Sequence, residues 1–242
     1  MALAPDILDH ILSFLQPDTT ALKACSKSHP FLSKIAERYL YVNVAVHDGG
    51  YITQPDEYDL NFREIIKLLS DNPHIANYVR NLAFCISRPR DLADVSCVLP
   101  MFSRLTKVAL RGRGVGWIAL PDTFRRAFLE CIYMKEVFIE NIWNFQLSCL
   151  NNCKVATLSR LQYLLPTNFD VSSTAQLKSL SIEECDAVKI GDWVKTLSLH
   201  SLRLSGPSDT FGLEISRIPE FLPNTLIKLE LDFKDQRMSF FL

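Results

Sequence analysis

The sequence predicts an α/β fold: an N-terminal module of three helices, followed by an irregular solenoid of repeats with a parallel sheet and covering helices. Three observations lead to this prediction. Apolar residues recur at helical spacing through residues 7–40. Short segments with one shared apolar pattern then return along the chain at nearly regular intervals. Most of these intervals contain a segment with helical spacing.

The first predicted helix lies in "LAPDILDHILSFLQPD", residues 3–18. Its apolar side chains recur at helical spacing and are Ile7, Leu8, Ile11, Leu12 and Leu15. Pro5 suits the first turn, because the N–H that proline lacks has no helical partner there. An isolated helix of this length is not stable in water. Its apolar side therefore either packs into the protein's own core or binds a partner.

Two further helices and a strand follow. Asp18 is suited to cap the second helix, and the His29–Pro30 pair ends it. The predicted ranges are 19–26 for the second helix, 31–41 for the third helix, 41–46 for an alternating strand and 47–60 for a loop.

From residue 62 onward, helical segments alternate with strand-like runs. The helical candidates are residues 62–70, 123–132, 145–153 and 215–222. The runs share the pattern L-x-x-L-x-L and are "VRNLAF", "LTKVAL", "MKEVFI", "LKSLSI", "LHSLRL" and "LIKLEL", with a weaker copy in "VATLSRL". Their middle apolar residues are Leu82, Val108, Val137, Leu158, Leu180, Leu202 and Leu229, at successive spacings of 26, 29, 21, 22, 22 and 27 residues.

These spacings match the period of leucine-rich repeats, which is about 20–29 residues. The run "LKSLSIEEC" (177–185) also places Cys185 where such repeats use Asn or Cys to satisfy backbone groups in the turn. Similar hexamers also arise in a leucine-rich α/β protein that has no repeats, and that alternative stays open at this point. The regular spacing and the intervening helices favour the irregular solenoid.

In such a solenoid the leucine positions face the core, and the residues between them face outward on the concave side of the sheet. The outward residues predicted to bind a protein substrate are Lys107, Arg111, Glu136, Phe138, Ser181, Glu183, Arg203, Lys228 and Glu230, with Glu140 and Asp232 on the same face. Their mixed charges and single aromatic ring favour a protein partner over a small molecule or nucleic acid. A solvated sheet face without a partner is the alternative.

The composition argues against several classes of protein. The 26 Lys and Arg residues nearly balance the 27 Asp and Glu residues, so there is no general attraction to nucleic acid or to an anionic membrane. No uncharged segment approaches the ~18 apolar residues of a membrane span, and the N-terminus lacks the pattern of a signal peptide. Seven cysteines without a C-x-x-C pair predict reduced thiols and a cytoplasmic or nuclear location.

The N-terminal segment resembles an F-box, a motif that begins L-P-x-E-I/L-L, continues through I-L/F-x-x-L-x-P and ends with a third helix. The matching positions are Leu3, Asp6, Ile7, Leu8, Ile11, Leu12, Leu15 and Pro17, then Leu22 and Cys25, then Phe31, Leu32 and Tyr39. Asp6 replaces the usual Glu, and Ala4 replaces the usual Pro, although Pro5 follows. The rest of the chain resembles fungal F-box proteins with degenerate leucine-rich repeats.

That resemblance implies a non-catalytic substrate receptor of a Skp–cullin–F-box ubiquitin ligase. Residues 1–46 would be the box, residues 47–78 a linker with a bridging helix, and residues 79–242 the repeats that hold a protein substrate. The residues implied to bind the Skp-type adaptor are Pro5, Asp6, Ile7, Leu8, Ile11, Leu15, Leu22 and Phe31. The sequence leaves open which of the apolar ones face inward. The alternative is a protein-interaction scaffold whose N-terminal helices only cap the solenoid.

Motifs for catalysis, cofactors and metals do not occur in the sequence. The segment "LRGRGVGW" (110–117) carries G-x-G-x-G rather than a dinucleotide fingerprint, and it is predicted to be a turn that leaves a repeat strand. No two histidines stand three or four residues apart, and neither H-E-x-x-H nor G-x-S-x-G occurs. We therefore expect no enzyme, no cofactor and no metal site, although catalytic groups can also come together from distant positions.

Overall fold

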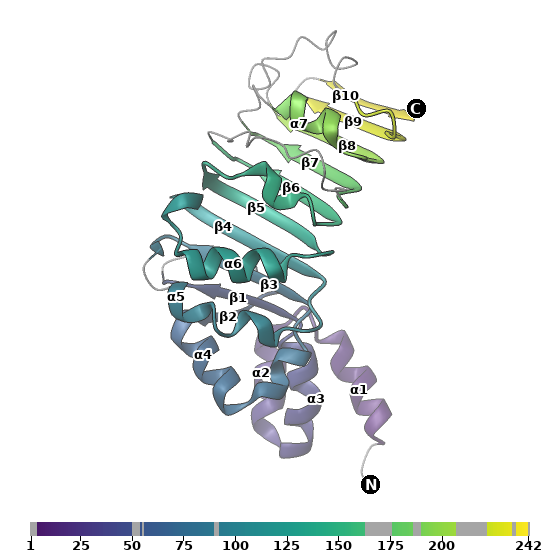
Figure 1. Ribbon diagram of the computed structural model, residues 1–242. Coiled ribbons are helices and arrows are strands. Elements are labelled where there is room, and N and C mark those ends of the chain that lie inside the picture. The colour runs from purple at the N-terminus through teal and green to yellow at the C-terminus, as the bar shows by residue number, and fades with distance from the viewer. Residues whose placement is uncertain are drawn as a thin grey trace.

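The computed structural model describes residues 4–49, 54, 56–89, 92–162, 176–185, 190–206, 222–233 and 236–241. Within these ranges, ten strands form one continuous sheet, and the N-terminal helices lie at one end of it (Figure 1). The predicted α/β class is confirmed.

The three N-terminal helices form where the apolar spacing predicts them. They are α1 (Pro5–Phe14), α2 (Thr19–Ser28) and α3 (Pro30–Leu40). Pro5 begins α1, and the N–H of Ala21 donates to Asp18 Oδ1 at 2.9 Å, so Asp18 caps α2 as expected. Leu3, the first residue of the F-box-like pattern, lies outside the described residues.

The strands follow chain order in the sheet except at its beginning, where β2 lies outside β1. Their spatial order is β2 (Tyr58–Asn61), β1 (Asn43–His47), β3 (Asn81–Ile86), β4 (Lys107–Gly116), β5 (Glu136–Trp143), β6 (Val155–Ser159), β7 (Ser179–Glu183), β8 (Ser201–Gly206), β9 (Lys228–Phe233) and β10 (Gln236–Phe241). All neighbours pair in parallel except β10, which is antiparallel to β9. Each predicted strand run therefore forms a strand.

The pairing register corrects one of the repeat positions. Val108 pairs with Val137 as expected, but the β6 residue beside Val137 is Ala156 and not Leu158. Ala156 in turn pairs with Leu180, so the equivalent position lies 19 residues after Val137 and 24 residues before Leu180. Because Ala156 is small, the larger Leu158 dominates the pattern in the sequence.

The turn after β7 uses a cysteine as the repeat pattern predicts. The N–H of Leu161 donates to Cys185 Sγ at 3.5 Å, and the thiol faces the carbonyl oxygens of Leu158 and Glu183 at 3.5 and 3.3 Å. Cys185 is buried, so these contacts satisfy backbone groups that water cannot reach. The predicted role of Cys185 is confirmed.

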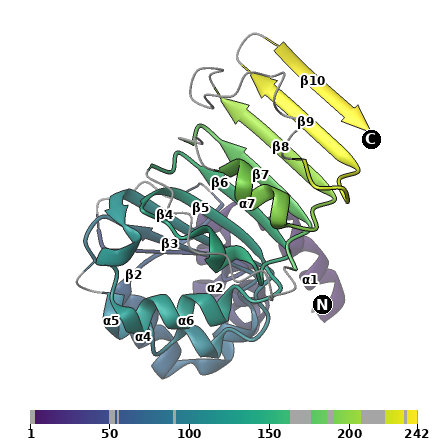
Figure 2. The ribbon, with the colours of Figure 1, turned by 45° about the horizontal axis from the view of Figure 1, so that its top comes forward.

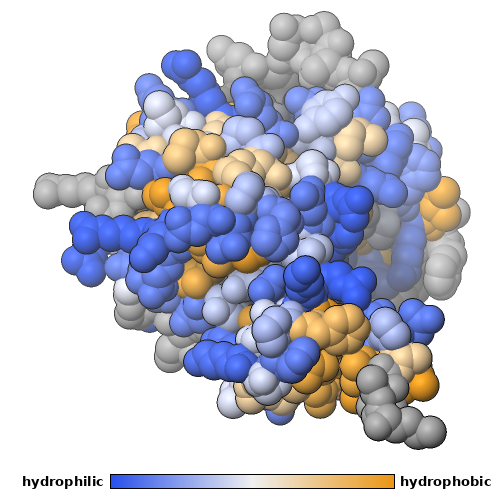
Figure 3. Space-filling view, turned by 90° about the horizontal axis from the view of Figure 1, so that it is seen from below, coloured by the Kyte–Doolittle hydropathy of each residue, from blue (hydrophilic) through white to orange (hydrophobic). Residues whose placement is uncertain are grey.

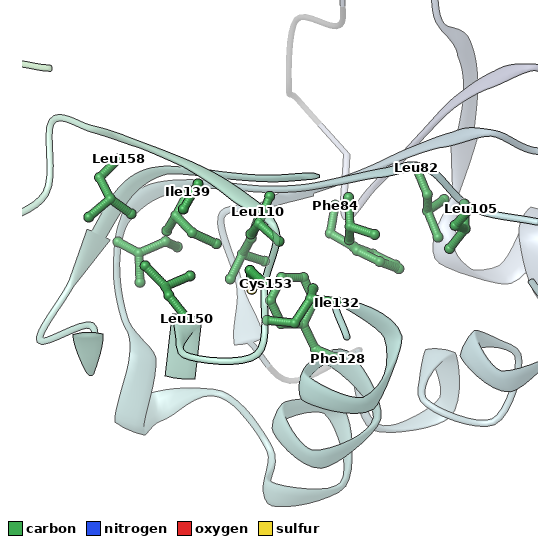
Figure 4. Close-up of a cluster of buried hydrophobic side chains, with 14 of the residues drawn as sticks. Leu82, Phe84, Leu105, Leu110, Phe128, Ile132, Ile139, Leu150, Cys153 and Leu158 are labelled. Carbon is green, nitrogen blue, oxygen red and sulfur yellow. The ribbon is translucent and has the colours of Figure 1, made fainter. Parts of the chain in front are cut away.

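Burial alternates along most of the strands, although β1 and β3 are buried on both faces, and one face of the sheet is covered by helices. In β8, Leu202 and Leu204 are buried, while Ser201, Arg203 and Ser205, which alternate with them, are half-buried. The covering helices are α4 (Phe62–Asp71), α5 (Leu92–Val95), α6 (Asp122–Cys131) and α7 (Ile190–Thr196) (Figure 2). Leu110 points from the sheet toward Phe128 of α6, and Ile139 points from the sheet toward Leu150 (Figure 4). We call the opposite side of the sheet the open face.

Short 3₁₀ helices complete the connections, and they are η1 (Pro73–Asn77), η3 (Leu99–Met101), η4 (Trp117–Ala119) and η5 (Leu147–Leu150). The predicted helices at 62–70 and 123–132 are confirmed as α4 and α6. The helix predicted at 145–153 is wrong, because only the single turn η5 forms there. Except for residue 222, the helix predicted at 215–222 lies outside the described residues.

Among the α-helices and strands of the described residues, α5, α7 and β10 were not predicted from the sequence, and β2 lies in the predicted loop. Residues 47–60 are not wholly a loop, because β2 begins at Tyr58. β2 has four residues, too few for a clear alternation, and it is stabilised by pairing with β1. Short edge strands of this kind depend on their neighbour and carry little signal of their own.

The glycine-rich segment lies inside β4, so the predicted turn is wrong. β4 pairs with β5 as far as Arg111, shifts register and pairs again from Val115. A Cβ on Gly112 would lie 2.5 Å from Ile142 Cδ1 and 2.7 Å from the backbone oxygen of Asn141. Glycine at this position therefore lets the two strands stay close across the shift.

Candidate functional site

Apolar side chains are exposed along one side of α1. Ile7, Ile11 and Phe14 are four and three residues apart, which places them on one side of the helix. Their exposed fractions are 50%, 46% and 72%. We call these three residues the α1 stripe. Phe31, at the beginning of α3, is 41% exposed. Viewed from the end that carries the N-terminal helices, apolar surface gathers at one edge of the molecule (Figure 3).

The opposite sides of the same helices hold the three-helix unit together. Leu12 and Leu22 are buried, and Leu8 and Leu15 are half-buried against the core. Arg38 Nη2 lies 2.8 Å from Asp9 Oδ1 and ties α3 to α1. The apolar contacts inside the unit leave the α1 stripe exposed.

The residues predicted to bind an adaptor differ in how far they are exposed. Ile7, Ile11 and Phe31 are exposed and available, as are Pro5 and Asp6 at the beginning of α1. Leu8 and Leu15 are only partly available, because they pack against the core. The contact predicted for Leu22 is wrong, because this side chain is fully buried between the helices and cannot reach a partner.

Phe14 is the most exposed residue of the α1 stripe, and the sequence prediction omitted it. It stands seven residues after Ile7 and three after Ile11, so helical spacing alone would have placed it with them. Its ring lies 4.8 Å from that of His10 in an edge-on arrangement. The F-box-like pattern does not use this position, and for that reason it was missed.

The charged residues predicted on the open face lie there, and most of them neutralise one another. The ion pairs are Lys107–Glu136 at 2.9 Å, Arg111–Glu57 at 2.8 Å, Arg203–Asp232 at 3.2 Å and Lys228–Glu230. Ser181 Oγ donates to Glu183 Oε1 at 3.2 Å. The predicted set divides in two: four residues lie on β4 and β5, and five lie on β7, β8 and β9.

The first of these groups surrounds a cavity of about 260 Å3 on the open face. Ala83 and Ala109, which pair across β3 and β4, form its floor, and Phe138 of β5 forms one wall. Asp56 and Glu57, just before β2, form the opposite wall. Polar side chains close the two ends of the cavity. Arg111 lies at one end, and the other end is formed by Asn43, Asn81, Lys107 and Glu136. We call this cavity the β4 pocket.

The Arg111–Glu57 ion pair is largely shielded from water. The two side chains are 14% and 10% exposed, and Arg111 Nη1 lies 2.8 and 3.0 Å from the two carboxylate oxygens of Glu57. Burial lowers the pKa of Arg111, but Glu57 raises it, and the net rise keeps the guanidinium charged. Arg111 therefore lies on the open face as predicted, where it closes one end of the β4 pocket, and its charge is neutralised by Glu57.

One pair of residues has the chemical types of a thiol catalyst. Cys85 and His47 pair across β3 and β1. However, His47 Nε2 lies 2.8 Å from Asp59 Oδ1, and His47 Nδ1 accepts the N–H of Gly49 at 2.9 Å. Burial raises the pKa of the Cys85 thiol to about 12, and the Arg111 guanidinium only partly offsets this rise. The thiol stays protonated at neutral pH, and the imidazole is already occupied, so this pair does not supply an activated nucleophile.

No protein-family model, curated protein or solved structure matches this chain. The α1 stripe and the open face are therefore the features that bear on its function. Across the described ranges, no group of three or more His, Cys, Asp or Glu side chains could hold a metal ion. In the same part of the chain, no helix is both long and apolar enough to cross a membrane.

Proposed function

We propose that this chain is the substrate receptor of a Skp–cullin–F-box ubiquitin ligase. In this proposal α1, α2 and α3 form an F-box-like module that binds a Skp-type adaptor. The sheet from β3 to β9 is an array of degenerate leucine-rich repeats that holds a protein substrate on its open face. The chain itself carries out no catalysis.

The observation that carries the proposal is the α1 stripe. Three large apolar side chains stay exposed on one helix, while the other sides of the three helices are buried in the core that continues into the sheet. An amphipathic helix with anchors at such spacing is typical of a helix that lies in an apolar groove of a partner. Exposed apolar surface of this kind marks interaction sites in proteins.

A repeat array is supported by the strand spacing and by Cys185. Seven neighbouring strands, β3 to β9, pair in parallel, with buried apolar residues on one face and mainly polar residues on the other, and the register shifts only between β4 and β5. Stacking of this kind is how repeats bury a face that one unit cannot bury alone. The open face then presents a continuous surface on which a protein can lie.

One observation favours the second candidate, a scaffold whose helices only cap the repeats. β1 follows α3 directly and lies inside the sheet between β2 and β3. The three helices are therefore continuous with the array, as a cap would be. A cap needs a polar outer surface, however, and Phe14 at 72% exposed does not fit that requirement.

Binding to a purified Skp-type adaptor tests the proposal. We expect the full chain to bind, and Ile7→Asp to weaken binding about a hundredfold or more, because a carboxylate would have to lose its water in an apolar groove. Ala24→Asp is the matched control, since Ala24 is exposed on α2 and lies outside the α1 stripe. This control should bind like the unmodified chain.

Circular dichroism should show that both variants are folded, because both positions are exposed. Equal binding by the full chain and a folded Ile7→Asp variant would exclude docking through the α1 stripe. No binding by the folded full chain would favour the capped scaffold.

A further inference from the structure

The β4 pocket has an apolar interior although its rim is charged. Its floor is made by the methyl groups of Ala83 and Ala109, and the Phe138 ring forms a wall above them. The guanidinium carbon of Arg111 lies 6.0 Å from the centre of that ring, within range of a cation–π contact. A ligand group that fills this space touches carbon on three sides.

The polar groups of the rim already have partners inside the protein. Lys107 is paired with Glu136, Arg111 with Glu57, and the Asn81 amide donates to Asn43 Oδ1 at 2.6 Å. Few donors or acceptors remain to orient a polar small molecule, which such sites need for specificity. The interior therefore suits an apolar group more than a polar one.

The size and shape of the pocket point to one planar side chain. Its volume of about 260 Å3 lies below the range of about 300–1,000 Å3 for pockets that hold drug-sized ligands. An aromatic ring can lie flat on the two alanine methyl groups and meet the Phe138 ring edge-on, an arrangement that aromatic pairs favour. Arg111 can then lie beside the ring of the ligand, as it lies beside the ring of Phe138.

The charges and the adjoining surface indicate how the ring is presented. The lining residues carry three carboxylates, on Asp56, Glu57 and Glu136, but only two cations. Asp56 is exposed, and its Oδ2 accepts a hydrogen bond from the neutral amide of Asn43 at 3.3 Å. A basic residue next to the ring would complement Asp56. Beyond Phe138, the next two residues in the same row of the open face are Thr157 and Ser181. Both side chains are small, so a flat, extended segment of a ligand has room above them.

We infer that the β4 pocket binds an aromatic side chain of a protein substrate, presented by an extended segment with a Lys or Arg next to it. This inference rests on the part of the proposed function that places a protein substrate on the open face. Single aromatic anchors in pockets of this kind dominate the affinity of many interfaces.

Selection from a library of random linear peptides displayed on phage, with the full chain as the target, tests the inference. We expect the enriched peptides to share one Trp, Tyr or Phe with an adjacent Lys or Arg. Ala109→Gln should fill the pocket and Phe138→Ala should remove its wall. Each change should weaken binding of a selected peptide about tenfold or more, as measured by fluorescence anisotropy. Ala24→Gln adds the same side chain at an exposed position of α2, away from the open face, and it should leave peptide binding unchanged.

Two results would overturn the inference: enrichment of no shared aromatic position, or equal binding by the folded Ala109→Gln and Phe138→Ala variants. Adaptor binding measured on the same proteins separates this test from that of the proposed function. Aromatic peptides that bind a chain without affinity for the adaptor would support the pocket and reject the ligase role. Adaptor binding by a chain that enriches no aromatic peptide would support the ligase role and reject the pocket.

Discussion

At the scale of single residues, the contact between Glu57 and Arg111 shows how much the molecule depends on long-range pairing. The two residues are 54 positions apart, and their side chains meet over the open face with little exposure to water. A second pair, Lys107–Glu136, has nearly the same distance but is 56% and 43% exposed. Both are ion pairs, but Arg111–Glu57 is largely buried and Lys107–Glu136 is exposed to water.

This difference predicts different losses of stability. Glu57→Gln leaves the Arg111 guanidinium without its counter-ion in a place that water hardly reaches, so we expect the free energy of unfolding to fall by about 3–5 kcal/mol. Glu136→Gln is the control, and we expect a loss of about 0–1 kcal/mol because its pair is solvated. Urea unfolding of both variants measures the two losses, and equal losses would contradict this account.

At the scale of one element, β4 shows how a strand accommodates an irregularity. The strand runs from Lys107 to Gly116 through a register shift, and Gly112 lies in the shift with backbone of β5 close beside it. The same glycines that look like a loop in the sequence permit the strand to continue.

Substituting the glycines of β4 tests this reading. Gly112→Ala should lower the free energy of unfolding by about 1–3 kcal/mol, because the new methyl group meets Ile142 and the Asn141 backbone. Gly116→Ala should change it by less than about 0.5 kcal/mol, because the nearest atom, Ala119 Cβ, is 3.9 Å away. Thermal and urea unfolding provide the measurement. A Gly112→Ala variant as stable as Gly116→Ala would show that the strands have room at the shift.

At the scale of the whole molecule, the N-terminal segment belongs partly to the sheet. β1 pairs with β2 on one side and with β3 on the other. The α1 stripe and the β4 pocket also lie near each other, because a second cavity is lined by Phe14 of α1 together with Asn43 and Asp56 of the pocket wall. A partner on α1 and a substrate on the open face would therefore be neighbours.

Two truncations should separate the helices from the sheet. Removal of residues 1–16 takes away α1 and should leave one cooperative unfolding transition. Removal of residues 1–46 also removes nearly all of β1, which detaches β2 and exposes the edge of β3, so we expect aggregation. Size-exclusion chromatography and thermal unfolding monitored by circular dichroism distinguish the two. A monomeric, cooperative product of the longer deletion would show that the sheet is independent of β1.

Part of the candidate site could be predicted from the sequence. Ile7, Ile11 and Phe31 were placed among the adaptor-binding residues, and Phe138 with its charged neighbours was placed on the exposed side of the strands. Leu22 was misplaced and Phe14 was missed. Helical spacing groups residues on one side of a helix, but only the neighbouring helices decide which side becomes buried.

The sequence by itself determined the α/β class, the three N-terminal helices, the positions of β1 and of β3 to β9, and the alternation of buried and exposed residues along most of these strands. These follow from apolar periodicity, which is a local property of the chain. The tertiary structure decided the register at Ala156, the pairing of β2, the burial of Leu22 and the meeting of Glu57 with Arg111. Those features depend on how distant segments pack, and no local pattern encodes the geometry of the connections between them.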